Sequence, residues 1–224
     1  MRVVIAGGHG KIAMILERLL AQRGDSVAGL IRNPAQSADL EAAGAEAVVV
    51  DLEHAGVEDV AVHLRGADAV VFAAGAGPGS GAARKETVDR AAAVLLADAA
   101  LRAGVRRYVM VSAMGADRGA GPGTDKAASD PVFAAYLRAK AAADEEVLAR
   151  EGLETTIVRP GHLTDESATG RVHIAATTGR GNVSRHDVAA VLVAVLDAPE
   201  TAGRTLELIG GDTPLSEAVQ AAWA

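Results

Sequence analysis

The chain has 224 residues, of which 50% are hydrophobic and 2% aromatic, with a formal net charge of −7 and no cysteine. The negative charge argues against nucleic-acid binding by phosphate neutralisation. Without cysteine there are no disulfides, no thiolate catalysis and no cysteine-ligated zinc, and the histidine spacing predicts no metal site. With no apolar stretch of about 18 residues and no signal-peptide pattern, we expect a soluble cytoplasmic protein that binds no membrane.

The first element is an apolar strand, Val3–Ala6, which is followed by a glycine-rich turn and an amphipathic helix. Gly7 can adopt a strained turn because it lacks a Cβ atom, and at Gly10 no side chain blocks the place where phosphates would pass. Backbone N–H groups and the helix N-terminus together favour a pyrophosphate, and Ala13 is a permitted third position of the dinucleotide fingerprint. The expected phosphate-binding residues are Gly7, Gly8, His9, Gly10, Lys11 and Ile12.

The second strand, Ser26–Ile31, ends at Arg32 and Asn33. In NAD-binding proteins an Asp or Glu about 20 residues past the glycines holds the ribose 2′-hydroxyl. The guanidinium of Arg32 suits a 2′-phosphate instead, because it offers charge-assisted, bidentate hydrogen bonds. The residues at this strand end therefore favour NADP(H) over NAD, although a solvated arginine at a strand end is the simpler alternative.

Strand and helix patterns alternate along the rest of the chain, as in a parallel sheet covered on both faces. Residues 115–130 have no periodicity, and a loop of this length is usually functional or mobile. The strands are expected at 45–50, 68–72, 107–112, 154–159, 171–176 and 205–209, and the helices at 34–42, 57–64, 85–103, 131–151, from 184 onward and at 214–223, with Thr213 as the last N-cap.

This succession predicts a single Rossmann domain over residues 1–224, a doubly wound α/β fold with sheet order 3-2-1-4-5-6. Residues from about 160 to 224 would form a small part on the substrate side. Ligands bind such folds at the carboxyl ends of the strands, beside strands 1 and 4. Small and polar residues stand at several of these ends, namely Asp51 and Leu52, Ala73, Ala74 and Gly75, Ser112 and Ala113, and Pro160 and Gly161.

Tyr136 and Lys140 are four residues apart in the helix expected at 131–151, so they share one helix face. A nearby ammonium would lower the pKa of the phenol and make Tyr136 a general acid for a carbonyl oxygen. A tyrosine packed on the sheet beside a solvated lysine is the simpler alternative. His162 is a weaker candidate for a proton donor.

The chain resembles the short-chain dehydrogenase/reductase superfamily, in particular its atypical NAD(P)H-binding branch with NmrA-like and epimerase/dehydratase-like members. The motifs that carry the resemblance are Gly7–Ala13, Ile31–Asn33, Asp51–Glu53, Phe72–Gly75, Tyr108–Ser112, Tyr136 with Lys140, Ile157–Thr164 and Ser184–Ala189. The resemblance implies that Asp51 and Leu52 contact the adenine, and that Ala74 and Gly75 border the ribose and phosphates. It also implies that Lys140 bonds the nicotinamide ribose and that Pro160 and Leu163 border the nicotinamide.

The chain departs from the active reductases of this superfamily at the catalytic serine, whose place falls on Ala113. Ser112 remains a catalytic and cofactor-binding candidate, although a regular strand would point its side chain to the opposite face. We expect an NADP(H)-dependent oxidoreductase acting on a small carbonyl or alcohol. Because the C-terminal part is short, the substrate must be small or be covered by residues 115–130 acting as a lid. The alternatives are an NmrA-like NADP(H) sensor that regulates a protein partner and, less favoured because of the short C-terminal part, a sugar-nucleotide epimerase or dehydratase. A homo-oligomer stays open.

Overall fold

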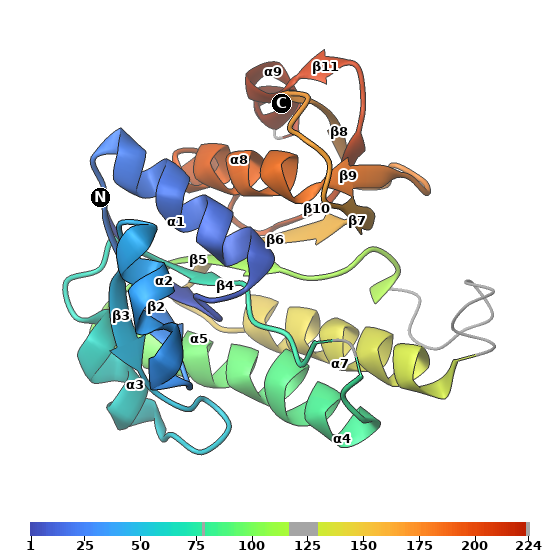
Figure 1. Cartoon of the computed structure of the whole chain (residues 1–224). Helices are drawn as coiled ribbons and strands as arrows, with labels where there is room; N and C mark the ends of the chain where they lie inside the picture. The colour runs from blue at the N-terminus through green and yellow to red at the C-terminus, as the bar shows by residue number, and fades with distance from the viewer. Residues whose placement is uncertain (78, 117–129, 223–224) are drawn as a thin grey trace.

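The computed structural model describes residues 1–77, 79–116 and 130–222. A central sheet lies between two helical layers (Figure 1). Helices α1 (Lys11–Arg23), α2 (Ser37–Ala42), α8 (Arg185–Leu196) and α9 (Leu215–Ala221) cover one face of the sheet, and α3 (Val57–Leu64), α5 (Ala92–Ala103) and α7 (Pro131–Leu148) cover the other. The expected doubly wound Rossmann architecture is confirmed.

The main sheet has the order β11-β8-β10-β6-β5-β4-β1-β2-β3. The predicted order 3-2-1-4-5-6 is therefore correct, and β10 extends the parallel part beyond β6. Strands β8 and β11 add an antiparallel edge. The strands are β1 (Arg2–Ala6), β2 (Ser26–Ile31), β3 (Glu46–Val49), β4 (Ala69–Phe72), β5 (Arg107–Val111), β6 (Glu154–Pro160), β8 (Arg171–Ala175), β10 (Arg204–Gly210) and β11 (Thr213–Pro214).

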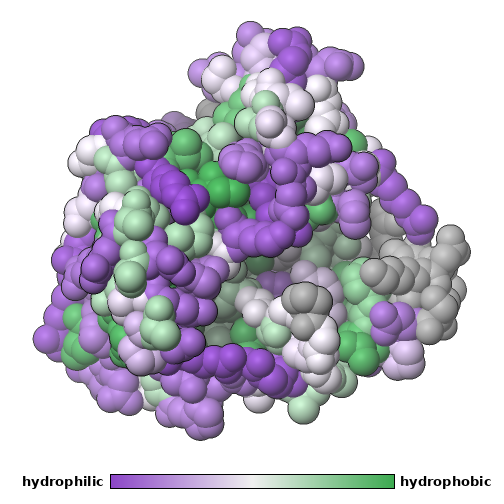
Figure 2. All heavy atoms as spheres, viewed as in Figure 1, coloured by the Kyte–Doolittle hydropathy of each residue, from purple (hydrophilic) through white to green (hydrophobic). Residues whose placement is uncertain are grey.

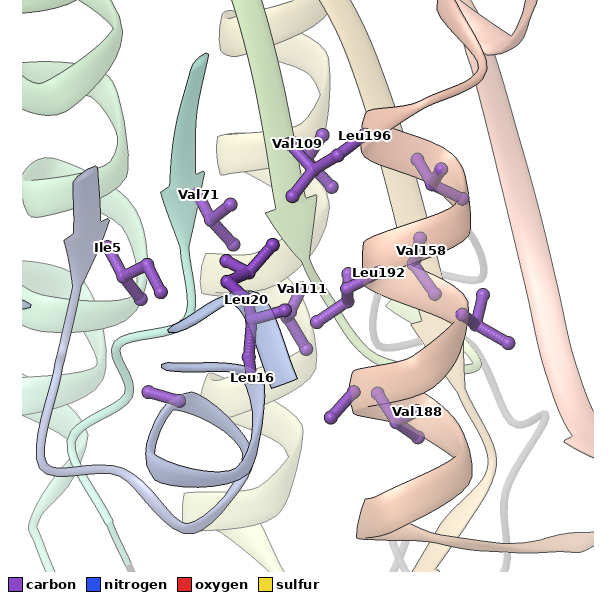
Figure 3. Packing of buried hydrophobic residues seen from close by; sticks show 14 of the residues in the cluster. Ile5, Leu16, Leu20, Val71, Val109, Val111, Val158, Val188, Leu192 and Leu196 are labelled. Carbon is purple, nitrogen blue, oxygen red and sulfur yellow. The ribbon is translucent and has the colours of Figure 1, made fainter. Parts of the chain in front are cut away.

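The sheet is buried on both faces because its strands are apolar at consecutive positions, as parallel strands require. In β1, Val3 and Ile5 face one core cluster, whereas Val4 and Ala6 face the other. Figure 3 shows the first cluster, in which sheet residues pack against side chains of α1 and α8. The labelled members are Ile5, Val71, Val109, Val111 and Val158 from the sheet, and Leu16, Leu20, Val188, Leu192 and Leu196 from the helices. This rigid stack fixes the strand ends that form the site.

The helix expected over residues 85–103 is interrupted. A short helix, α4 (Ala82–Arg84), leads into the π-helical segment η2 (Lys85–Ala91), and α5 follows. A π-helix adds one residue to a turn and is frequent at functional sites. Here it buries Lys85, Val88 and Asp89 beside the end of β4. The apolar periodicity did not show this, because a one-residue bulge changes the pattern very little.

Other differences lie near the C-terminal end of the chain. Thr213 is not the N-cap of the last helix, because it pairs with β8 in the short strand β11 and Pro214 takes the cap position. A small second sheet of β7 (His162–Thr164) and β9 (Asn182–Ser184) was not predicted, since three-residue strands carry no readable alternation. Ser184 caps α8 by accepting the backbone N–H of Asp187, as its place at the predicted helix start suggests.

Two short 3-10 helices, η1 (Pro34–Gln36) and η4 (Pro199–Thr201), complete the described elements. Residues 117–129 of the predicted loop and lid lie outside the described residues. Among the helices of the described part, none is both long and apolar enough to cross a membrane.

Candidate active site

Two cavities open along the carboxyl ends of the parallel strands, and the middle of the face seen in Figure 2 is recessed. The first cavity, of about 290 Å³, lies at the ends of β1 to β4 and is lined by Gly7, His9, Gly10, Leu30, Ile31, Arg32, Gln36, Val50, Asp51, Leu52, Glu53, Ala73, Ala74, Gly75, Ala76, Arg84, Val88 and Ala92. The second, of about 920 Å³, lies at the ends of β5 and β6 and beside the small sheet. Because β4 and β5 pair directly, the two cavities border neighbouring strands.

The glycine turn between β1 and α1 is closely packed. Gly7 has a φ of +79°, and a Cβ atom built on it would lie 2.6 Å from the Cα of Ala74. Its carbonyl accepts the N–H of Gly10 at 2.8 Å. Gly10 is the N-cap of α1 and offers no side-chain cap, and the first turn of α1 has no acidic residue. The first N–H groups of this helix therefore face the cavity edge as donors for an anion.

Behind the turn, a buried carboxyl group fills the space that two glycines leave. A Cβ on Gly8 would lie 3.0 Å from Oε1 of Glu17, and one on Gly29 would lie 2.6 Å from the same atom. Glu17 is fully buried, and neither carboxyl oxygen has a hydrogen-bond partner among the described residues. Burial raises the pKa of Glu17 to about 8, so this carboxyl is protonated at neutral pH. Gly8 thus serves the packing of the turn and does not line either cavity.

The outer end of the first cavity holds a charged cluster. Nη1 of Arg32 donates to Oε2 of Glu53 at 2.9 Å, and Nη2 of Arg84 donates to the same oxygen at 2.7 Å. The hydroxyl of Thr87 donates to Oε1 of Glu53 at 2.7 Å. Hydrogen bonds from Arg84 and Thr87 lower the pKa of Glu53, which keeps it ionised. Glu53 therefore holds two guanidinium groups at the place where the sequence showed only Arg32.

The second cavity contains Tyr136, whose ring lies 5.9 Å from that of Phe133. Nζ of Lys85 lies 5.4 Å from the centre of the Tyr136 ring. Burial raises the pKa of Tyr136 well above its usual value, and the charges of Asp89 and Asp144 raise it further. The predicted lowering of this pKa is wrong, because desolvation and the charges of two carboxylates all raise it.

Lys140 is directed at the end of β5 and is itself buried. Its Nζ donates to the carbonyl of Val111 at 3.1 Å and lies 3.6 Å from Oδ1 of Asp89. Burial lowers the pKa of Lys140, while Asp89 opposes that change. Asp89 also accepts the backbone N–H of Ala76 at 3.3 Å, so Lys140 and Asp89 together brace the loop after β4. Lys140 lines neither cavity.

Ser112 lies at the wall of the second cavity, but its hydroxyl is engaged elsewhere. Its Oγ donates to Oδ2 of Asp144 on α7 at 2.9 Å, and Nε of Arg159 donates to the same oxygen at 2.9 Å. Burial raises the pKa of Asp144, although these two hydrogen bonds favour its ionised form. The hydroxyl is thus held by α7, while the side chain of Ala113 has no hydrogen-bond donor to offer the cavity.

The far wall of the second cavity comes from the C-terminal part of the chain. Pro160, Gly161 and Leu163, three of the predicted cofactor-binding residues, lie there together with His162. A Cβ on Gly161 would lie 2.3 Å from the carbonyl oxygen of Gly181, so only glycine permits this close approach. Three polar residues of this wall, Arg180, Asn182 and Arg185, were not predicted.

A family model described as NAD(P)H-binding matches residues 7–199 of the chain. The chain belongs to this NAD(P)H-binding family. Its curated relatives include a Bacillus subtilis (strain 168) protein described as an uncharacterized sugar epimerase, YhfK. The two are 38% identical over 221 residues, which cover 98% of this chain and 99% of the relative.

Solved structures of similar proteins cover the NAD(P)H-binding chain almost completely. One, from Bacillus halodurans and provisionally described as an NAD-dependent epimerase/dehydratase, has a TM-score of 0.87 and 35% identity over 99% of both chains. The oxidoreductase ylbE from Lactococcus lactis has a TM-score of 0.85 and 25% identity, covering 99% of this chain and 96% of its own. The resemblance to the atypical short-chain dehydrogenase/reductase branch is confirmed.

Nine of the eighteen residues predicted to bind the cofactor lie in the wall of the first cavity. They are Gly7, His9, Gly10, Arg32, Asp51, Leu52, Ala73, Ala74 and Gly75. Four others line the second cavity, namely Ser112, Pro160, Gly161 and Leu163, and five line neither cavity, namely Gly8, Lys11, Ile12, Asn33 and Lys140. Asn33 caps η1 through the N–H of Ala35, Ile12 packs on the core, and Nζ of Lys11 bonds Asp165 at 2.7 Å. Glu53 and Arg84 were missed as site residues, although Glu53 is the last residue of the Asp51–Glu53 motif. No sequence motif pointed to Arg84, which lies at the end of the short helix α4 just before the π-helical segment η2.

No group of three or more His, Asp or Glu side chains that could hold a metal ion is present in residues 1–77, 79–116 and 130–222. The described residues that line the two cavities supply a glycine turn, a phenol and several cationic side chains.

Proposed function

We propose that the chain is an NADP(H)-dependent oxidoreductase that interconverts a carbonyl compound and its alcohol. The observation that carries the proposal is the position of Tyr136 in a cavity beside the one that has the dinucleotide geometry. The first turn of α1 would hold the pyrophosphate, Asp51 and Leu52 would border the adenine, and Pro160 and Leu163 would border the nicotinamide. When bound, the reduced cofactor supplies a hydride to the carbonyl carbon.

Tyr136 would supply the proton that the carbonyl oxygen gains. Its raised pKa keeps the phenol protonated throughout the neutral range, so its hydroxyl is a hydrogen-bond donor there. An alkoxide that develops on the substrate is more basic than a phenolate, so the proton moves to it. The raised pKa also makes Tyr136 a weaker acid than the superfamily's activated tyrosine. Turnover should therefore be slow and should change little between pH 6 and pH 9.

NADP(H) is favoured over NAD(H) by the two guanidinium groups at the outer end of the first cavity. Arg32 and Arg84 flank Glu53, and their side chains are 53% and 39% exposed, so each would reach a 2′-phosphate that enters from solvent. Glu53 works in the other direction, because its carboxylate repels a 2′-phosphate and can accept a ribose 2′-hydroxyl. The proposal is that two cations outweigh this one carboxylate.

The deciding experiment is NADPH oxidation against quinones, aldehydes and ketones by the wild type and Tyr136→Phe. Turnover should fall by about 10²-fold in the variant, as loss of a general acid does, while the Kd for NADPH stays unchanged. The matched control is Tyr108→Phe, which removes the other hydroxyl, one that donates to the carbonyl of Ala93 in the core. This control should lose about 1 kcal/mol of stability and keep its turnover. Full turnover in Tyr136→Phe would reject the mechanism.

A second candidate is a sugar epimerase, the activity that the name of YhfK gives for that relative. An epimerase would convert a nucleotide sugar without net consumption of the cofactor, so product analysis with UDP-sugars separates the two functions. Tight NADPH binding with no conversion of any substrate would instead favour the sensor function, in which the cofactor state regulates a protein partner.

A further inference from the structure

The second cavity holds two aromatic residues that lie outside the core. Apart from Trp223, which lies outside the described residues, the aromatic residues of the chain are two phenylalanines and two tyrosines. Phe72 and Tyr108 are fully buried in the core, whereas Phe133 and Tyr136 both line the second cavity with a tilt of 33° between their rings. Met114 adds a polarizable side chain to the same wall. In a chain with so few aromatic residues, this placement favours a flat, apolar group as the ligand.

The charge of this cavity is opposite to that of the chain. The chain has 29 acidic and 22 basic residues. Among the described residues that line the second cavity, Arg180, Arg185 and His162 are basic and none is acidic, whereas the first cavity contains Asp51 and Glu53. A cavity wall of a single sign raises the local concentration of ligands of the opposite charge.

Arg185 is held so that it reaches this wall. Its Nη1 donates to Oδ1 of Asp165 at 2.6 Å, and its side chain is only 22% exposed. Asp165 is 63% exposed, does not line the cavity, and also accepts Nζ of Lys11. A guanidinium has five N–H donors in a fixed plane, so one bond to Asp165 orients Arg185 and leaves donors for a carboxylate.

We infer that the second cavity binds an organic anion, a conjugated or aromatic compound whose carboxylate contacts Arg180 and Arg185 while its rings pack on Phe133 and Tyr136. The cavity volume of about 920 Å³ suits a ligand with several rings better than the small carbonyl compound that the short C-terminal part predicted. The inference rests on the proposed function only in taking this ligand to be the substrate. A ketone or aldehyde on the conjugated system would be reduced to the alcohol as NADPH becomes NADP⁺ and Tyr136 gives up its proton.

Calorimetry with two probes of equal shape tests the inference, namely 2-naphthoate and the uncharged 2-naphthamide, each titrated with and without NADP⁺. The wild type should bind the carboxylate at least about tenfold more tightly than the amide. Arg180→Gln and Arg185→Gln should each weaken naphthoate binding by about tenfold and leave the amide unchanged. Phe133→Leu should weaken both probes alike.

The control is Arg138→Gln, which removes the same charge from the exposed surface of α7 and should change neither affinity. Equal binding of the two probes, or an equal loss in Arg138→Gln and the cavity variants, would overturn the inference. Failure of NADP⁺ to bind would reject the proposed function alone, because the probe preference measured without the cofactor still decides the anion site.

Discussion

The two cavities border neighbouring strands but are built in different ways. The first cavity takes most of its wall from the first half of the chain, and its arginines are matched by Glu53. The second combines the end of β5, helix α7 and the small β7–β9 sheet, and its described wall carries cations without a carboxylate. The first cavity is therefore built from four neighbouring strand ends within residues 7–92, whereas the second joins segments between residues 112 and 185.

The largest expected effect concerns the glycine turn of the first cavity. Gly10→Val should abolish dinucleotide binding, because a branched side chain would fill the path of the pyrophosphate, and a Cβ there already lies 3.0 Å from the carbonyl of Gly7. Calorimetry with NADPH and circular dichroism measure binding and fold. Gly81→Val, where nothing lies within 4 Å of the new Cβ, is the control. Retained NADPH affinity in a folded Gly10→Val protein would show that the phosphates bind elsewhere.

The next largest effect is a pH dependence of stability caused by Glu17, which packs behind the glycine turn of the first cavity and does not line it. Glu17 keeps its proton up to about pH 8 in the folded protein, whereas in the unfolded chain it loses the proton near the ordinary glutamate pKa of 4.5. The unfolded state therefore binds fewer protons between these values, and stability falls by about 3 kcal/mol from pH 5 to pH 8.

Urea unfolding at pH 5, 6.5 and 8 measures this dependence in the wild type and in Glu17→Gln, which cannot titrate. The variant should have a nearly flat profile, whereas the exposed control Glu46→Gln should follow the wild type. A wild-type profile that rises with pH would contradict the assignment of a protonated Glu17.

Cofactor choice tests whether the matched charges of the first cavity favour NADPH. Arg32→Gln should weaken NADPH binding by about 1.5–3 kcal/mol and leave NADH nearly unchanged, because charge-assisted bonds to the 2′-phosphate are lost. Glu53→Gln should act in the opposite direction and raise the ratio of NADPH to NADH affinity. Calorimetry with both cofactors measures these changes. Equal affinity of the wild type for NADPH and NADH would reject the assignment.

The smallest effect is expected in the second cavity. Ala113→Ser would restore a hydroxyl at the position where the reductase superfamily has its catalytic serine, while Ser112 stays bonded to Asp144. Turnover should stay equal or rise, with no change in the Kd for NADPH. A loss of turnover in this variant would mean that the added hydroxyl obstructs the substrate, so that Ala113 is needed for its small size.

The sequence by itself determined the Rossmann order of the first six strands, the glycine turn and the position of Arg32 at the end of β2. These features are local, because a turn or a strand end depends on a few consecutive residues and on a simple periodicity. The pairing of Arg32 and Arg84 with Glu53, the buried bond from Lys140 to Val111 and the raised pKa of Tyr136 depend on segments far apart in the chain. Only the tertiary structure decided these, since burial and the charges brought near a group set its partners and its pKa.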